Sequence, residues 1–277
     1  MLISHETPIC LLEESLKFND YDFILNHLLD KHPKYKEFYL NKSQRTSILD
    51  NSSYEYFING QEFDEGNFIK NIKELQPTYY LIPDVLMDSE KTMELFEKWK
   101  YVNKYEFVNC KKIAVVQGKT LKEWLDCYLF YWKNQQHFDK IAISFHYDFL
   151  KTFSIPYSES EDVLYALGRF NLLKFLFDNK MIMNKPYHLL GSHIGGIEFH
   201  WYKVNEFNFI ETIDTGYPVK FGIEEILTSG LNMQGDPESN IKKPNIILDD
   251  FIDKELTEIQ IETILENIKT FKTQIYG

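Results

Sequence analysis

The sequence has no apolar run of about 18 or more residues, the length that a membrane-spanning helix needs. Its first ten residues also lack the basic stretch followed by an apolar one that marks a signal peptide. We therefore expect a cytoplasmic protein that makes no use of a membrane.

Cysteine is scarce and scattered. Cys10, Cys110 and Cys127 stand far apart, with no Cys-x-x-Cys pair and no Cys/His cluster. This spacing argues against a disulfide framework and against a zinc site, so we expect no metal and three reduced, structural thiols. Glycine is also not arranged for phosphate binding, because the segment GSHIGG at 191–196 lacks the spacing of a phosphate or dinucleotide loop.

Positive charge is in short supply. The formal net charge is −12 and the sequence pI is about 5.2, which argues against a protein that coats nucleic acid by neutralising phosphates. Local lysine pairs at 111–112, at 242–243 and at 269 and 272 could still form a basic patch. Each pair is more typical of a solvated surface.

The chain is rich in apolar and aromatic residues, and their pattern predicts an α/β fold. Its 277 residues are 44% hydrophobic, enough for one large core. A strand, a polar loop and a helix follow one another seven times, which is typical of a parallel sheet wrapped by helices. The predicted strands cover 8–12, 46–49, 78–82, 112–116, 140–144, 187–190 and 209–214.

Seven such units favour a (β/α)8 TIM-like barrel over an open sheet. We predict one domain over residues 1–277, with a closing helix over about 255–276. The eighth strand is not clearly assigned by the pattern, and Asn245 to Leu248 is a candidate for it. The predicted helices cover 20–29, 64–75, 89–99, 121–132, 161–179 and this last segment.

Polar residues recur where the predicted strands end. The clearest case is FIETIDTGYPVK at 209–220, in which a strand delivers Asp214 to a Thr-Gly-Tyr-Pro turn. Strand ends of a barrel meet at one mouth, where such folds keep their chemistry. The residues expected there are Asp50, Asp84, Gln117, Gly118, His146, Leu190, Gly191 and Asp214.

Carboxylates, an amide and exposed glycines suit a site that holds a polar planar ring. Carboxylates accept from ring N–H and amino groups, and an amide N–H donates to a ring carbonyl. A remaining carboxylate could attack an electron-poor carbon such as a sugar C1.

Each of these residues also has a simpler interpretation. Asp50 could form an Asx turn, Asp84 could be a loop acid, and Asp88 could cap the helix that follows it. Gln117 with Gly118 could be a plain strand-to-helix turn, and His146 could serve in packing.

The sequence resembles the tRNA-guanine transglycosylase superfamily, in particular its small phage and bacterial members that exchange guanine in DNA for a 7-deazaguanine. Six segments carry the resemblance in the family's order, from about Ser4 to Pro218. They are SHETPICLLEESLKFNDYDFILNHLL, ILDNSSYE, IPDVLMDSEKT, VVQGKT, HLLGSHIGG and ETIDTG.

The resemblance implies a role for most strand-end residues. Asp214 matches the carboxylate nucleophile that forms a covalent glycosyl-enzyme, and Asp50 matches a second carboxylate that handles the proton of the base. Asp84, or Asp88 in an alternative register, matches the reader of the guanine N1–H and amino group. Gln117 with Gly118 matches the amide that reads the ring carbonyl, and Leu190 with Gly191 resembles the next pocket segment. The family offers no role for His146.

One departure bears on the substrate. The tRNA enzymes carry a Cys/Cys/Cys/His zinc subdomain after the nucleophile, whereas residues 215–277 contain no cysteine. The resemblance therefore implies a zinc-free enzyme of a bacterial or phage-infected cell that acts on DNA rather than tRNA. Its partners would be DNA and a free base such as 7-cyano-7-deazaguanine, with no other cofactor. A target base in a duplex would have to be flipped out, and the acidic chain could require a helper protein or act as a homodimer.

Other functions stay open at this point. A DNA glycosylase would use the same site with water in place of the incoming base, and a tRNA-directed exchange would differ only in the polymer. A nucleic-acid-binding or protein-binding barrel would keep the fold without turnover. An unrelated barrel glycosidase would use Asp50 and Asp214 on free sugars.

Overall fold

The protein has an α/β fold of the TIM-like class, as the sequence predicts. The computed structural model describes residues 1–41, 45–102, 107, 109–154, 160–192, 194–230 and 246–276. Eight strands alternate with helices and belong to one parallel sheet in the order β1-β8-β7-β6-β5-β4-β3-β2. The strands are β1 (Leu2–His5), β2 (Asp22–Leu25), β3 (Ser47–Asp50), β4 (Tyr79–Leu81), β5 (Lys111–Val115), β6 (Lys140–Ser144), β7 (Tyr187–Leu190) and β8 (Ile210–Thr215).

The central strands form where short apolar runs are buried on both faces. In β5 and β6 nearly every side chain is buried, and the two strands pair in parallel with Ala114 opposite Ile141. Continuous burial of this kind is what helices on both sides of a parallel sheet require. Six of the seven predicted strands are present within a residue or two of the expected bounds.

Helices begin at residues whose side chains accept from the first turn. Asp64 accepts from the Asn67 N–H at the start of α5, and Thr120 forms a capping box with Glu123 at the start of α7. The helices are α1 (Leu12–Phe18), α2 (Asn26–Lys31), α3 (Pro33–Asn41), α4 (Ser53–Ile58), α5 (Glu65–Leu75), α6 (Ser89–Trp99), α7 (Leu121–Lys133), α8 (Glu161–Asp178), α9 (Gly196–Val204), α10 (Tyr217–Ile223) and α11 (Glu258–Tyr276).

The first predicted strand, 8–12, is wrong. The first strand is β1, and Ile9–Leu11 is a short 3-10 helix. The sequence hid β1 because two of its four residues, Ser4 and His5, are polar yet buried.

The predicted helix over 20–29 is wrong in its first half. Asp22–Leu25 is strand β2, which pairs in parallel with β3, and only the second half is helical as α2. A short, fully buried run shows no periodicity that distinguishes a strand from a helix. Pairing with β3 is what makes this segment a strand.

The predicted eighth strand is also wrong. Asn245 lies outside the described residues, and Leu248–Phe251 is a 3-10 helix. β1 and β2 complete the set of eight instead.

Two compact units make up the chain, each with its own core. Unit 1 contains residues 1–20, 148–182 and 189–277, and unit 2 contains residues 21–147 and 183–188. Within the described ranges, no helix has both the length and the apolar character needed to cross a bilayer. The prediction of a single domain over 1–277 stays a prediction.

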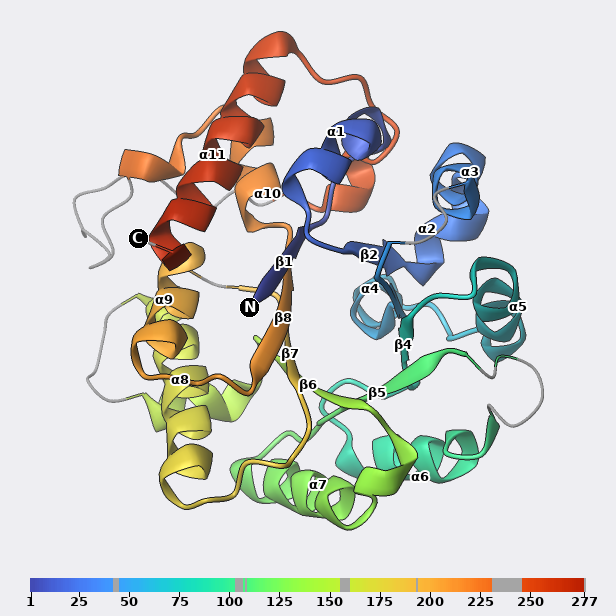
Figure 1. Cartoon of the computed structure of the whole chain (residues 1–277), viewed down its shortest axis with the longest axis vertical. Coiled ribbons are helices and arrows are strands. Elements are labelled where there is room, and N and C mark those ends of the chain that lie inside the picture. Colours follow the sequence, from blue (N-terminus) through green and yellow to red (C-terminus); the bar gives the residue numbers. More distant parts are fainter. Residues whose placement is uncertain are drawn as a thin grey trace. The chain divides into compact units, whose positions relative to one another are not determined.

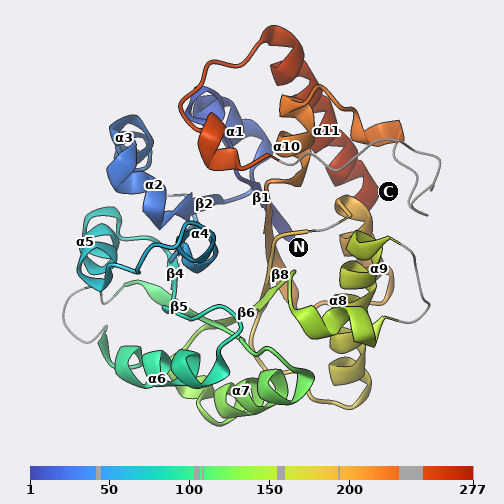
Figure 2. The same cartoon turned by 180° about the vertical axis from the view of Figure 1, so that it is seen from behind.

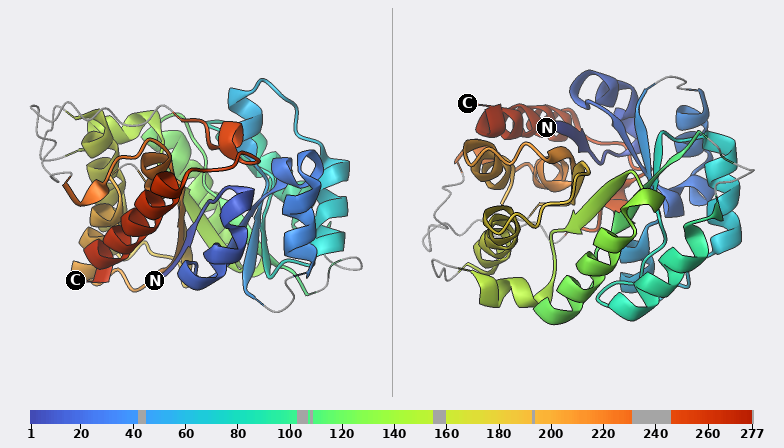
Figure 3. Two further views of the ribbon diagram at one scale, coloured as in Figure 1. Left: turned by 90° about the horizontal axis from the view of Figure 1, so that it is seen from above. Right: turned by 60° about the horizontal axis from the view of Figure 1, so that its bottom comes forward.

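Among the described residues, unit 1 contains the pair of strands β1 and β8 and the helices α1, α8, α9, α10 and α11. The C-terminal helix α11, predicted from its periodicity, packs against α10 and α9 (Figure 1). Gly222 allows α10 to approach α11 closely, because a Cβ atom at position 222 would lie 2.4 Å from Ile264 of α11. In this unit the Tyr276 hydroxyl donates to the Met1 carbonyl over 2.7 Å. Accordingly, the end of α11 lies near the start of β1 (Figure 3).

Unit 2 contains β2 to β6 in consecutive order, with α2 to α7 between and beside them (Figure 2). Its core is aromatic: Phe68, Tyr80 and Trp99 are fully buried and meet with ring centroids 5.6 to 6.2 Å apart. The strands β3, β4 and β5 are neighbours in the sheet, so the residues that follow them lie side by side.

Candidate functional site

Asp214 lies near the carboxyl end of β8 in unit 1. Its side chain is 3% exposed, and its register partner on β1 is Ser4. Burial raises the pKa of Asp214 to about 7, while a backbone hydrogen bond from Gly191 and the charge of Arg169 act in the lowering direction. The folded protein therefore retains the proton of this carboxyl group to a higher pH than an exposed aspartate does.

A buried ion pair supports the segment beside Asp214. Arg169 of α8 and Glu198 of α9 are both fully buried, and Arg169 Nη2 lies 2.6 Å from Glu198 Oε1. Arg169 Nε donates to the same oxygen over 2.7 Å, and the Tyr202 hydroxyl donates to it over 3.0 Å. A charge pair removed from water needs this number of donors to offset its desolvation.

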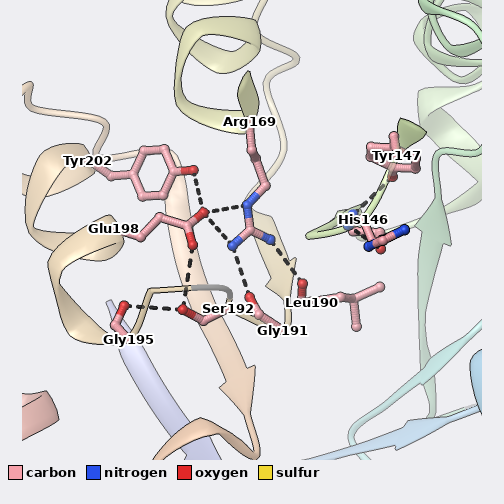
Figure 4. A network of polar contacts seen from close by, with 10 residues as sticks. His146, Tyr147, Arg169, Leu190, Gly191, Ser192, Gly195, Glu198 and Tyr202 are labelled. Atoms are coloured by element: carbon pink, nitrogen blue, oxygen red, sulfur yellow. Dashed lines mark hydrogen bonds and ion pairs between the residues drawn. The ribbon is translucent and has the colours of Figure 1, made fainter. Parts of the chain in front are cut away.

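The turn after β7 is held by the same arginine. Arg169 Nη1 donates to the Leu190 carbonyl and Nη2 donates to the Gly191 carbonyl, each over 2.9 Å. Gly191 has φ +65° and Gly195 has φ +70°, in the region that favours glycine. Figure 4 shows Arg169 at the centre of this network, with Ser192 and Glu198 joined to it.

In unit 2 the centre of the polar groups is Asp84, which follows β4. Its Oδ1 accepts from Asn51 Nδ2 over 2.7 Å, and its Oδ2 accepts from Gln117 Nε2 over 2.7 Å. Ser53 Oγ lies 3.1 Å from Oδ1. Burial raises the pKa of Asp84 above its ordinary value, and these three donors act against that rise.

Gln117 is engaged at both ends of its amide. The Nε2 group donates to Asp84, and Oε1 accepts from the Met87 N–H over 3.0 Å. Its side chain is buried. The amide therefore fixes the position of the Asp84 carboxylate and of the loop that contains Met87.

Asp50 ends β3 and forms the Asx turn that was the simpler interpretation of its sequence. Its Oδ2 accepts from the Ser52 N–H over 2.7 Å, and Ser52 has φ +59°. His27 Nδ1 lies 2.9 Å from Ser52 Oγ, and the His27 N–H donates to the same oxygen over 3.2 Å. These contacts hold Ser52 in a conformation that a non-glycine residue rarely adopts.

Three other candidates have mainly structural surroundings. Asp88 caps α6 by accepting from the Lys91 N–H over 3.0 Å, and this bond lowers its pKa. Gly118 allows the start of α7 to pack against the backbone of residue 118, since a Cβ atom there would lie 2.3 Å from the Trp124 backbone nitrogen. His146 is partly buried, and its backbone N–H donates to Ser144 Oγ over 3.3 Å (Figure 4).

The structure thus joins the candidates in two groups. Asp84 and Gln117 contact each other in unit 2, and Gly191 contacts Asp214 in unit 1. The prediction that all strand-end residues converge on one mouth stays a prediction. Within the part of the chain that the structure describes, no three His, Cys, Asp or Glu side chains are grouped so as to hold a metal ion.

Sequence reasoning missed four residues of these groups: Asn51, Ser53, Arg169 and Glu198. The first two follow Asp50 within three residues, where a turn after the strand is enough to explain polar side chains. For Arg169 there was a signal, because the chain has only two arginines and this one stands in the apolar stretch ALGRFNLL. Arginine in such a stretch is buried only with a partner.

No family model matches the chain, and no curated protein matches it either. The fold and the two carboxylate groups are therefore the structural basis for a functional proposal, and the family resemblance remains a prediction from the sequence motifs.

Proposed function

We propose that the protein is a DNA-guanine transglycosylase, which exchanges guanine in DNA for a 7-deazaguanine derivative. The observation that carries the proposal is the Asp214 carboxyl group: it is buried at a strand end, with a backbone donor from Gly191 and an arginine nearby. A carboxylate in these surroundings can act as a nucleophile once it is ionised.

In the proposed reaction an Asp214 oxygen attacks the sugar C1′, and the bond from C1′ to guanine N9 breaks. The bonding electrons leave with guanine, which takes up one proton. The incoming 7-deazaguanine then loses one proton from its five-membered-ring nitrogen, attacks C1′ and releases Asp214. Protons and electrons balance over the exchange, so no cofactor is needed. Asp50, buried at the end of β3, is the proposed carrier of these protons.

Recognition of the base is assigned to Asp84. Its two oxygens are oriented by Asn51, Ser53 and Gln117, and a carboxylate has about four acceptor positions. The acceptor capacity left over suits the N1–H and amino group of guanine. A 7-deazaguanine presents the same two donors, which explains how one site would accept both bases.

The polymer partner is proposed to be DNA. The net charge of −12 predicts weak binding with a strong dependence on salt, or a need for a helper protein. Measuring the affinity for duplex DNA at several salt concentrations tests this point, and tight binding that ignores salt would contradict it.

The test of the function is exchange of labelled guanine, and separately of 7-cyano-7-deazaguanine, into duplex DNA, single-stranded DNA and tRNA. Wild type and Asp214→Ala are compared, with Asp126→Asn as the matched control because Asp126 is exposed on α7. Incorporation into DNA that is lost only in Asp214→Ala supports the proposal. Release of base without incorporation would identify a glycosylase, and incorporation into tRNA alone would identify a tRNA-directed enzyme. Activity on none of the three polymers would refute the proposed function.

A further inference from the structure

The peptide group between Leu190 and Gly191 lies between a cation and the Asp214 carboxyl. Its carbonyl oxygen accepts from Arg169 Nη1 over 2.9 Å, and the Gly191 nitrogen is the backbone hydrogen-bond partner of Asp214. In a planar trans peptide, C=O and N–H point in opposite directions. One rigid group therefore receives a hydrogen bond from the arginine and directs its own N–H at the acid.

The backbone at residues 190 and 191 lets one guanidinium bind two successive carbonyl groups. Successive carbonyls of an extended strand point to opposite sides, yet the carbonyls of Leu190 and Gly191 both accept from the guanidinium of Arg169. The positive φ of Gly191, +65°, makes this turn of the chain accessible. A planar fork that donates in two directions at once is a property of arginine, which lysine lacks.

Glu198 fixes the arginine in turn. It accepts from Nε over 2.7 Å and lies 2.6 Å from Nη2, so the guanidinium is bound along one edge and offers its other donors to the two carbonyls. Both side chains are fully buried, where charge is screened least. Hydrogen bonds in such a chain polarise one another, so the donor strength of the Gly191 N–H depends on Arg169.

We propose that Arg169, held by Glu198, is a positioning residue that orients and polarises the Leu190–Gly191 peptide toward Asp214 and so sets the pH at which Asp214 ionises. The importance of this ionisation for catalysis rests on the proposed function of Asp214 as a nucleophile. The positioning itself does not depend on that function.

The test measures the ionisation of Asp214 without an activity assay. The unfolding free energy is determined by urea denaturation from pH 4 to pH 9 for each protein and for its Asp214→Asn derivative. The pH dependence of the difference reports the ionisation midpoint of Asp214. The two variants are Arg169→Met/Glu198→Met, which removes the fork without leaving a buried charge, and Glu198→Gln, which keeps the fork and removes the opposing charge.

The proposal expects shifts of opposite sign. The midpoint of Asp214 should rise by about one pH unit in the Met/Met pair, because the carboxylate loses a polarised donor and a cation. It should fall by about one pH unit in Glu198→Gln, because the positive charge of Arg169 is no longer compensated. The matched control is Arg45→Met/Asp22→Asn, which removes the other arginine–carboxylate pair, in unit 2, and should leave the midpoint in place.

Midpoints that stay unchanged, or that move in the same direction in both variants, would overturn the proposal. An equal shift in the Arg45 control would also overturn it. Should the Met/Met pair not fold, the direction of the shift in Glu198→Gln decides alone. In an active enzyme the acid limb of kcat/KM should follow the same midpoints. If no exchange activity exists but the midpoints move as expected, the positioning stands and only the role of Asp214 as nucleophile falls.

Discussion

Asp214 and Asp84 are both acids at the ends of buried parallel strands, but their surroundings differ in kind. Asp84 is surrounded by three side-chain donors from Asn51, Ser53 and Gln117. Asp214 has a backbone hydrogen bond from Gly191 and the more distant charge of Arg169. This difference in surroundings fits two different roles for the two carboxyl groups. A carboxylate oriented by side-chain donors on both oxygens is suited to recognition, and a buried carboxyl group with a raised pKa is suited to the proposed attack.

The largest expected effect concerns the ion pair that supports the Asp214 side of this comparison. Arg169→Met leaves Glu198 buried without its cation and should lower the unfolding free energy by about 3–5 kcal/mol. Adding Glu198→Met should recover a substantial part of that loss. Urea denaturation of the two variants at pH 7 checks this, and a double variant no more stable than the single one would contradict it.

The second prediction concerns the raised pKa of Asp214. Between about pH 4 and pH 7 the folded protein binds this proton more tightly than the unfolded chain, so the contribution of Asp214 to stability falls as pH rises. Asp214→Asn lacks this pH-dependent contribution, because asparagine does not ionise. The unfolding free energy of Asp214→Asn, relative to that of wild type, should therefore rise between pH 4 and pH 8, by about 4 kcal/mol at most. Parallel curves for the two proteins would show that Asp214 ionises at its ordinary pH.

The third prediction tests the donors around Asp84. Gln117→Leu removes the donor to Oδ2 and the acceptor of the Met87 N–H, and should lower stability by about 1–3 kcal/mol. If the proposed function holds, base exchange should fall by about 10-fold or more, with most of the loss in KM for the free base. Thermal denaturation and exchange kinetics separate the two effects, and an unchanged KM would remove Gln117 from recognition.

The smallest effect is expected at Asp88, the residue that the alternative register would place in the base site. Asp88→Ala removes the cap of α6 and should lower the unfolding free energy by about 1 kcal/mol. Exchange kinetics should stay at the wild-type level. A loss of activity larger than that of Asp84→Asn would instead assign base recognition to Asp88.

The sequence predicted the repeating architecture because each unit of it is local. An apolar run such as Lys140–Ser144 forms a buried strand, and the Asp at position 64 begins a helix, whatever lies elsewhere in the chain. The first two strands escaped prediction because their identity depends on partners. β1 pairs with β8 from the far end of the sequence, and β2 was settled by pairing with β3.

Candidate residues were found wherever a strand visibly ended in a polar residue, as at Asp84 and Asp214. Their chemistry could not be predicted in the same way. Asn51 and Ser53 donate to Asp84 from the residues that follow β3, and Gln117 donates from those that follow β5. No spacing in the sequence predicts that these three side chains meet at Asp84.

By itself the sequence determined that strands and helices alternate, which residues end most of the strands, and where several helices begin. These follow from apolar periodicity and capping, which act over a few residues. Only the tertiary structure decided that Arg169 binds Glu198 and the carbonyls of residues 190 and 191, and that Asp214 is buried deeply enough for its pKa to rise to about 7. Desolvation and charge pairing act between groups that folding brings together, so the local sequence does not contain them.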